Sequence, residues 1–212
     1  LVLHFKGWSP YRPVVEDDST PDESGIIEAA PASSLANLRL RVTINDHQGF
    51  INGCGQMVIQ PQLTMALPFS DGLAAIGSRD PRTNEISWRF VNVSGVVVFS
   101  NTFKGASIGM FREGLAPIRQ GMKWGYINTT GHFVAQPMFD DAYEFSEGLA
   151  AVAIADRYGA IDRQGKVVIP LARESLGPCR NGRMKFTQDG HCGYLDARGR
   201  VVIAPTFDEA AN

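Results

Sequence analysis

The feature that most constrains this chain is a segment of eight residues that returns five times. Its clearest copy, Trp-Gly-Tyr-Ile-Asn-Thr-Thr-Gly, occupies residues 124–131. Related segments begin at residues 48, 88, 158 and 192, so successive copies lie 40, 36, 34 and 34 residues apart. A period of this length is typical of arrays in which each copy is one small supersecondary unit. We therefore expect repeats, and not one continuous core, to determine the fold.

Several positions recur in the same register in these copies. An aromatic residue opens three of the segments, a glycine follows the opening position in most of them, and a second glycine ends all five. These structural repeat positions are Trp88, Trp124 and Tyr158, then Gly125, Gly159 and Gly193, and finally Gly55, Gly95, Gly131, Gly165 and Gly199. Repetition at one register favours a role in the core of the array for the aromatic series.

Each unit carries three signals for β-strands. In the third unit, we expect a first strand alternating in period two over residues 115–119, a second over residues 124–128, which are rich in aromatic and β-branched side chains, and a third over residues 133–135. Between the second and third runs, Asn128 can bond its own backbone two residues on, and Gly131 accepts a positive φ. The sequence therefore predicts an all-β chain of three-stranded antiparallel units of about 34 residues.

Three local expectations accompany this prediction. The recurring prolines (Pro61, Pro137, Pro170 and Pro205) should close each third strand, since proline cannot donate to a ladder. The apolar spacing of residues 139–145 is compatible with a single helical turn. Residues 96–99 and 167–169 are continuously apolar, which is typical of a strand buried on both faces.

Three short strands cannot bury an apolar face alone, so neighbouring units must cover one another. We expect the units to stack as a solenoid or superhelix over residues 38–212. A five-bladed propeller is the alternative, but its blades usually need four strands and about 40 or more residues. Residues 1–37 contain an acidic stretch with Ser, Thr and Pro, which indicates either a linker or a degenerate capping unit.

The motifs Gly-Leu-Ala, Lys-Trp-Gly-Tyr-Ile-Asn and, further on, Pro and Phe-Asp resemble the bacterial WG (or KWG) β-repeat family. The resemblance covers roughly residues 38–212 and is strongest at 111–170 and 192–210. Gln48 and Cys192 replace the tryptophan in units one and five, and Arg89 replaces the glycine in unit two. The resemblance implies a non-catalytic scaffold that presents a repeat-built surface to another protein.

Composition narrows the functional classes. A net charge of −2 removes the strongly basic character on which nucleic-acid binding depends. No stretch approaches the ~20 apolar residues of a membrane span. The chain contains no phosphate loop, dinucleotide fingerprint, hydrolase elbow or metal-ligand cluster, so we expect no cofactor, no metal and no catalytic residue. An enzyme, or a regulatory domain of one, is the least favoured alternative, and the compartment (bacterial cytoplasm, cell envelope or secreted) stays open.

The candidate binding residues form a row in the repeat register. Each residue that immediately precedes the opening position is basic or titratable in four units: His47, Lys123, Arg157 and His191. In a stack these groups would lie about one unit apart and could meet an anionic partner, although charges on an exposed edge also serve to block aggregation. Trp124 would add an interface anchor or a sugar-stacking platform if it faced solvent. A cell-wall or glycan-binding surface protein is therefore the second functional hypothesis.

The three cysteines receive structural interpretations. Cys54 lies between two glycines in a predicted exposed turn and is interpreted as an incidental turn residue. Cys179 and Cys192 take positions that hold Phe and Trp in other units, which favours small buried hydrophobes over a disulfide or a ligand role.

Overall fold

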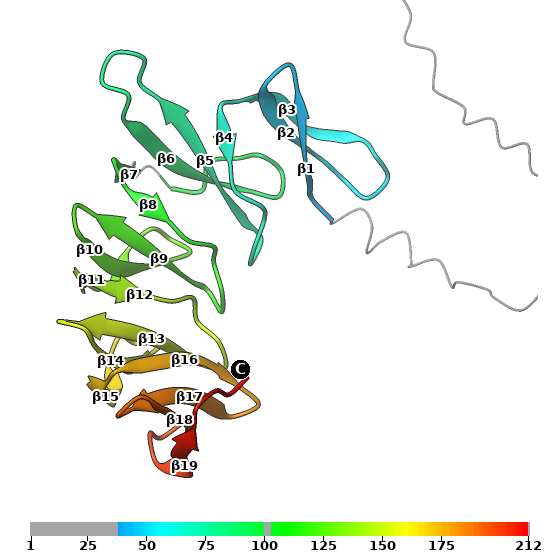
Figure 1. Ribbon diagram of the computed structural model, residues 1–212. Coiled ribbons are helices and arrows are strands. Elements are labelled where there is room, and N and C mark those ends of the chain that lie inside the picture. Colours follow the sequence, from blue (N-terminus) through cyan, green and yellow to red (C-terminus); the bar gives the residue numbers. More distant parts are fainter. Residues whose placement is uncertain (1–37, 100–102, 212) are drawn as a thin grey trace, which may run out of the picture. The chain divides into compact units, whose positions relative to one another are not determined.

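The computed structural model describes residues 38–99 and 103–211, and within them all regular structure is β. The strands form five antiparallel sheets, A to E, that follow one another along the chain (Figure 1). Sheet A consists of β1 (Leu40–Ile44), β2 (His47–Ile51) and β3 (Met57–Leu63). Sheet B consists of β4 (Met65–Ala66), β5 (Leu73–Arg79), β6 (Ile86–Asn92) and β7 (Phe103–Lys104). The acidic segment within residues 1–37 lies outside the described residues.

The remaining three sheets repeat this plan with strands in sequence order. Sheet C consists of β8 (Ser107–Ile108), β9 (Leu115–Gln120), β10 (Lys123–Asn128) and β11 (Phe133–Phe139). Sheet D consists of β12 (Asp141–Ala142), β13 (Leu149–Ile154), β14 (Arg157–Asp162) and β15 (Val167–Arg173). Sheet E consists of β16 (Ser175–Arg180), β17 (Arg183–Gln188), β18 (His191–Asp196) and β19 (Val201–Phe207).

Four of the sheets have one strand more than the sequence predicted. The segment that joins two units pairs with the first long strand of the next unit, as β12 does with β13 through Ala142 and Val152. This pairing satisfies backbone groups that the connection would otherwise leave without partners. The helical turn considered for residues 139–145 is wrong for the same reason, because β12 lies inside that segment.

The predicted turn chemistry is confirmed in every unit. The Oδ1 atom of Asn128 accepts the backbone N–H groups of Thr130 and His132, each at 3.0 Å. Equivalent pairs of bonds reach the side chains of Asn52, Asn92, Asp162 and Asp196. The closing glycine takes a left-handed conformation, with φ of 79° at Gly131. A local side-chain bond and a permissive residue are sufficient to specify this turn.

The prolines do not close the third strands, since β11 runs through Pro137 to Phe139. Between the pairs Tyr126–Ala135 and Trp124–Phe139 the register shifts, which places Pro137 in a β-bulge. A bulge is one of the few positions within a sheet where the missing N–H of proline is harmless. The bulge also brings the outer strand close to Gly125: a Cβ atom there would lie 2.5 Å from the Ala135 oxygen and 2.8 Å from the Pro137 nitrogen.

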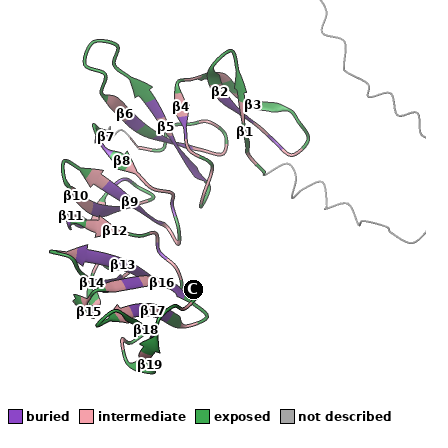
Figure 2. Ribbon diagram, in the orientation of Figure 1, coloured by how far each residue is buried: buried purple, intermediate pink, exposed green. Residues whose placement is uncertain are grey.

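The interior is divided among successive sheets. One cluster joins sheets A and B, a second joins B and C, a third joins C and D, and a fourth joins D and E. Buried residues accordingly gather on the central strands (Figure 2). Each unit thus obtains its core from its neighbours, as a stack of small repeats requires.

The described sheets form an open series and not a closed propeller (Figure 1). Closure would cover the outer faces of the first and last sheets, yet Leu40 on β1 is 45% exposed and Phe207 on β19 is 48% exposed. The strands expected to be buried on both faces are not: Val96 is 58% exposed and Val167 is 45% exposed. These residues lie at the outer edge of their sheets, where only one face, exemplified by Ile169, meets the next unit.

Candidate functional site

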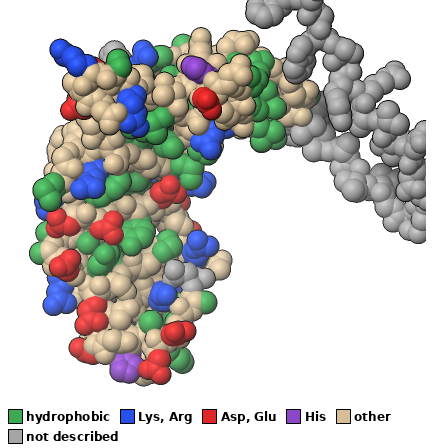
Figure 3. Space-filling view, turned by 45° about the horizontal axis from the view of Figure 1, so that its top comes forward, with side chains coloured by type: hydrophobic (Ala, Val, Ile, Leu, Met, Phe, Trp, Pro, Cys, Tyr) green, Lys and Arg blue, Asp and Glu red, His purple; other side chains and the backbone are tan. Residues whose placement is uncertain are grey.

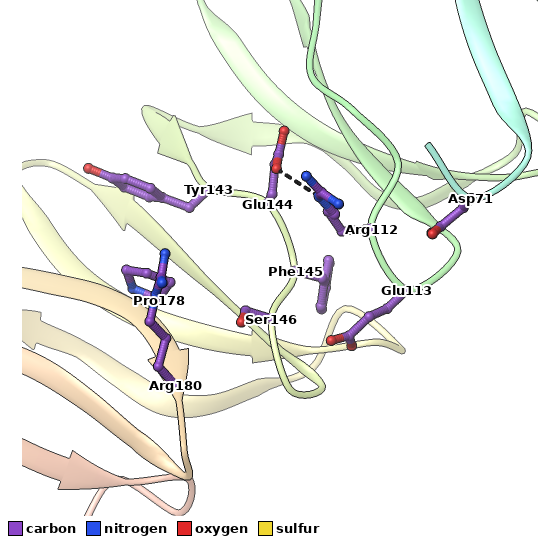
Figure 4. A pocket seen from close by; sticks show the side chains of 9 residues that line it. All are labelled: Asp71, Arg112, Glu113, Tyr143, Glu144, Phe145, Ser146, Pro178 and Arg180. Atoms are coloured by element: carbon purple, nitrogen blue, oxygen red, sulfur yellow. Dashed lines mark hydrogen bonds and ion pairs between the residues drawn. The ribbon is translucent and has the colours of Figure 1, made fainter. Parts of the chain in front are cut away.

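A groove of about 640 Å³ lies on the segments between the first and second strands of sheets B, C and D and on β16 of sheet E (Figure 4). Four consecutive units contribute to it. The lining residues are Asp71, Arg112, Glu113, Tyr143, Glu144, Phe145, Ser146, Pro178 and Arg180. The groove is therefore a property of the array, since no single unit contains more than a part of it.

Tight turns position these connecting segments. Before the first long strand of sheets B to E, two residues with positive φ reverse the chain, such as Glu113 (54°) with Gly114 (81°) and Glu147 (52°) with Gly148 (81°). Two consecutive left-handed residues are the requirement of a type I′ turn. The second position is glycine because it tolerates this conformation without steric cost.

Acidic side chains link each of these turns to the next one. The Asp71 carboxylate accepts the N–H of Gly114 at 2.7 Å, and the Glu113 carboxylate accepts the N–H of Gly148 at 2.8 Å. The Glu147 carboxylate accepts two amides, from Asn181 at 2.6 Å and from Gly182 at 2.7 Å. We call these three carboxylates (Asp71, Glu113 and Glu147) the turn ladder. Each of these carboxylates joins one repeat to the following repeat by hydrogen bonds, so its negative charge has a structural role.

The pKa of Glu147 reflects this role. The hydrogen bonds from the amides of Gly182 and Asn181 hold the pKa of the Glu147 carboxyl below its usual range. Hydrogen bonds to the charged form favour ionisation. The ladder carboxylates already accept hydrogen bonds from backbone amides, which leaves them poorly suited to transfer protons in the groove.

Both aromatic and polar side chains line the groove. Tyr143 is 41% exposed, whereas the ring of Phe145 is buried and packs against Tyr126 at a centroid distance of 5.1 Å. The Ser146 hydroxyl donates to the Cys179 carbonyl at 2.6 Å. Burial, followed by the charge of Asp141, raises the pKa of the Tyr143 hydroxyl. Tyr143 therefore presents a neutral ring and hydroxyl to a ligand at physiological pH.

Two arginines contribute positive charge to the groove and differ in their engagement. Arg112 Nε lies 3.3 Å from Glu144 Oε2, and Glu144 also accepts the Met110 N–H at 3.2 Å (Figure 4). Within residues 38–99 and 103–211, the exposed side chain of Arg180 makes no hydrogen bond or ion pair. Arg180 is therefore the group in the groove that is available to an anionic or carbonyl-bearing ligand.

The predicted row of basic residues lies outside the groove. His47, Lys123, Arg157 and His191 begin β2, β10, β14 and β18, so they share one corner of their sheets, and none of them lines the groove. In sheet B the same position is Ser87, which interrupts the row. Acidic and basic side chains are interspersed on the face seen in Figure 3, without a broad area of one sign.

Most members of the row already have partners. Lys123 Nζ pairs with the Asp140 carboxylate, and His191 Nε2 lies 3.8 Å from Asp208. The Nδ1 atom of His47 lies 2.8 Å from the Asn45 carbonyl oxygen. The acidic residues follow the third strand and face the basic ones across the sheet corner. This local neutralisation weakens the row as a site for an anion, and its binding role stays a prediction.

The aromatic series contributes to the core. Trp88 is 6% exposed, and its Nε1–H donates to the Ala106 carbonyl at 2.9 Å. Trp124 and Tyr158 are half-buried and pack against the clusters of sheets C/D and D/E. The glycan hypothesis needs exposed aromatic rings at these positions, so the burial of the aromatic series weakens it.

The cysteines occupy the predicted environments. Cys54 is exposed, Cys179 and Cys192 are buried, and all three are free. Burial, followed by the contact with Glu147, raises the pKa of the Cys179 thiol to about 11. A thiol with such a pKa is protonated at neutral pH and behaves as a small hydrophobe.

Sequence reasoning did not find the groove. Phe111, Phe145 and Cys179 each lie three residues before a turn glycine, a spacing that indicates turns but does not show that these segments gather on one side of the array. Among the described residues, no helix has the length and apolarity to cross a membrane. The same residues contain no group of three potential metal ligands in one place.

The chain is similar to known proteins both in sequence and in structure. A family model described as "WG containing repeat" matches residues 49–77, 88–124, 124–157, 158–190 and 193–212. No curated protein matches the sequence. A crystal structure of a eukaryotic initiation factor is similar to the chain, with a TM-score of 0.55 and 15% identity. A protein of unknown function from Bacteroides caccae is also similar, with a TM-score of 0.34 and 15% identity over 80% of this chain and 78% of that one.

The likeness to the initiation factor concerns the fold alone. It covers 76% of this chain and 49% of the other, so the chain spans about half the length of that structure. The family match, in contrast, extends over five consecutive segments that begin within β2, β6, β10, β14 and β18, and the first four segments each continue into the next sheet.

Proposed function

The chain belongs to the WG-repeat family, and from this premise we propose that it is a non-catalytic binding protein whose groove holds an extended segment of another protein. The observation that carries the proposal is the composition of the groove from equivalent connections of four successive units. A ligand that contacts all four connections must itself be elongated. A stretch of polypeptide has this shape, whereas a compact metabolite would contact one or two units.

The dimensions are consistent with a peptide. Stacked sheets lie roughly 10 Å apart, and an extended chain advances about 3.3 Å per residue. Each unit would therefore meet about three residues of ligand, and the three intervals from Asp71 to Pro178 would meet about nine. Backbone groups of such a segment would find donors and acceptors along the groove at a regular interval.

The side chains in the groove support protein recognition. Tyrosine and arginine are enriched among the residues that dominate binding energy at protein interfaces. Tyr143 offers an exposed ring beside the buried Phe145, and Arg180 offers an unengaged guanidinium. An acidic or C-terminal carboxylate of the ligand would pair with Arg180 in a bidentate geometry. The preferred ligand is therefore an extended segment with one apolar residue and one carboxylate.

The state of the acidic residues supports a binding role over catalysis. Asp71 and Glu113 accept turn amides, and Glu144 accepts from Arg112 and Met110. A general base needs a carboxylate or imidazole within reach of a substrate proton, and these carboxylates are already occupied by structural donors.

The proposal is tested by selecting peptides of about nine residues from a displayed random library on the immobilised chain. We expect selected peptides to carry an acidic residue and to bind the Tyr143→Ala and Arg180→Ala variants at least about tenfold more weakly, as truncation of a central interface residue does. Lys123→Ala is the matched control, because Lys123 lies in the predicted basic row and outside the groove.

Two outcomes contradict the proposal. Peptides that bind both groove variants as tightly as the unmodified chain would place the binding surface elsewhere. Loss of binding in Lys123→Ala, with full binding in Tyr143→Ala, would assign recognition to the basic row instead.

A further inference from the structure

A further cavity, of about 240 Å³, lies at the junction between sheets A and B. The described residues that line it include Leu63 of β3 with the following Thr64, Ile76 and Ser78 on β5, and Arg89 on β6. The cavity shares no lining residue with the groove, and sheets A and B are both described. It is therefore a feature of one internal junction, and its cause must lie in what distinguishes that junction from the others.

The first departure from the repeat pattern at this junction is a missing aromatic ring. Trp88 belongs to the cluster between sheets B and C, Trp124 packs against the cluster between C and D, and Tyr158 packs against the cluster between D and E. Unit one has Gln48 at this position, and its Oε1 atom accepts the Ala66 N–H at 2.6 Å. The A/B junction therefore lacks the large ring that the three later junctions contain.

The second departure is a missing carboxylate. After the third strands of sheets C and D, Asp140 accepts the Ala155 N–H at 2.9 Å, and Glu174 accepts the Asp189 N–H at 3.1 Å. Each carboxylate thus joins its sheet to the turn between the two long strands of the next sheet. Thr64 takes this position in unit one, and it lines the cavity. No acidic residue is found among the described residues that line the cavity.

The third departure places a cation in the cavity. Arg89 stands where the other four units have glycine, and it lies opposite Ile76, which packs against the cluster between sheets A and B. Among the residues that the structure describes, none forms a hydrogen bond or ion pair with the Arg89 side chain. An arginine that breaks a repeated pattern without a compensating contact is expected at a functional site.

We propose that this cavity binds a small organic carboxylate, with the guanidinium of Arg89 as its principal partner. The planar guanidinium can donate two parallel hydrogen bonds to a carboxylate, and this pairing is stronger than a neutral hydrogen bond. The ligand would supply at the A/B junction the negative charge that Asp140 and Glu174 supply at the two last junctions. The site uses no residue of the groove, so it is independent of the proposed peptide-binding function.

The remaining lining residues indicate the kind of carboxylate. The hydroxyl groups of Thr64 and Ser78 offer hydrogen bonds to further oxygen atoms, while the half-buried Leu63 and Ile76 offer apolar contact to a short carbon chain. Liquid water occupies about 30 Å³ per molecule, so the cavity accommodates about eight non-hydrogen atoms, the size of a dicarboxylate such as succinate. Because Arg89 is exposed, its ion pair contributes little, and we expect a dissociation constant of about 1 mM.

The test is a titration of the isotope-labelled full chain with sodium succinate at constant ionic strength, followed by NMR. We expect saturable shifts of the amide signals of Thr64 and Ser78 and of the Arg89 side-chain signal, with half-saturation at about 1 mM. Arg89→Gly restores the glycine of the other units, and Arg89→Gln keeps a polar side chain without the charge. Each should weaken binding at least about tenfold. The same spectra show whether each variant is folded.

Arg82→Ala is the matched control, because Arg82 is exposed on the turn between β5 and β6 and does not line the cavity. It should bind succinate as the unmodified chain does. The proposal is overturned by an absence of saturable shifts, by unchanged binding in Arg89→Gly, or by an equal loss of binding in Arg82→Ala. Shifts confined to Tyr143 and Arg180 would place succinate in the groove instead. Tighter binding of inorganic phosphate than of succinate would overturn the assignment to a carboxylate.

Discussion

At the scale of single residues, the glycine of the Trp-Gly motif recurs from unit to unit for a steric reason. Its missing Cβ lets the bulged outer strand approach the central strand, with the Ala135 oxygen 2.5 Å from where the Gly125 Cβ would be. Unit two has Arg89 at this position, and among its described residues the third strand is represented by a bridge at Val97 and the two residues of β7. The exception therefore accompanies a change in the strand that the glycine normally accommodates.

Replacement of Gly125 by alanine should lower the free energy of unfolding by about 3 kcal/mol, because the added methyl meets backbone atoms that cannot rotate away. Gly148→Ala is the control: its φ is 81°, but a Cβ there would meet no atom within 4 Å. That substitution should cost only the backbone strain, about 1 kcal/mol. Urea denaturation of both variants measures the difference. A Gly125→Ala variant as stable as Gly148→Ala would show that the bulge relaxes freely.

At the scale of the elements, successive sheets are joined by hydrogen bonds as well as by apolar clusters. The turn ladder runs between residues that are 34 to 43 positions apart in the chain, as Glu147 with Asn181 and Asp71 with Gly114. A carboxylate that accepts backbone amides is a charge-assisted acceptor and is stronger than a neutral one. The ladder therefore fixes the position of each connecting segment, and with it the shape of the groove.

The ladder makes stability depend on pH in a definite direction. The folded pKa of Glu147 lies below its usual value of 4.5, first because of the hydrogen bond from the Gly182 amide. Its contribution is fully present above the unfolded pKa and is lost as pH falls through the lower folded pKa. Glu147→Gln should therefore be less stable than the unmodified chain at pH 7, and the difference should shrink below pH 4.5. Urea denaturation at several pH values tests this, with Glu209→Gln as a control at an exposed position. A difference that is constant with pH would contradict the assignment.

At the scale of the whole molecule, each unit depends on its neighbours for an interior. The cluster between sheets D and E contains Ile169 from one unit and Met184, Phe186 and Leu195 from the next. Stability in such an array is approximately a sum of unit terms and nearest-neighbour junction terms. Loss of an end unit removes one junction, whereas damage to an internal unit affects two.

A chain that ends at residue 173 should still fold but with lower stability. It keeps sheets A to D and three of the four junction clusters, and it loses the cluster of sheets D and E. Because the denaturant m-value scales with the surface exposed on unfolding, we expect it to fall by about a fifth. Circular dichroism during urea unfolding measures both quantities. Complete loss of structure on truncation would contradict nearest-neighbour additivity.

The sequence alone determined the features that depend on local chemistry. The Asx turn at Asn128 and the left-handed glycine at Gly131 each act over a few residues, so their repetition was enough to predict an all-β array. The alternation expected for residues 115–119 is wrong, because residues 115–118 of β9 are all buried. The order of the units followed from their short connections. The same reasoning placed Cys179 and Cys192 in the interior, because they take positions filled by larger apolar residues in other units.

Only the tertiary structure decided which residues meet across units. The pairing of each connecting segment as a fourth strand, the bulge at Pro137 and the bond from Glu113 to Gly148 depend on how one sheet is set against the next. Repetition places Lys123 and His191 at one corner, but their partners Asp140 and Asp208 reach that corner through the bulged outer strand. Local sequence specifies the module, whereas the junction is a sum of contacts between residues 30 or more positions apart, and that sum was not readable from the period alone.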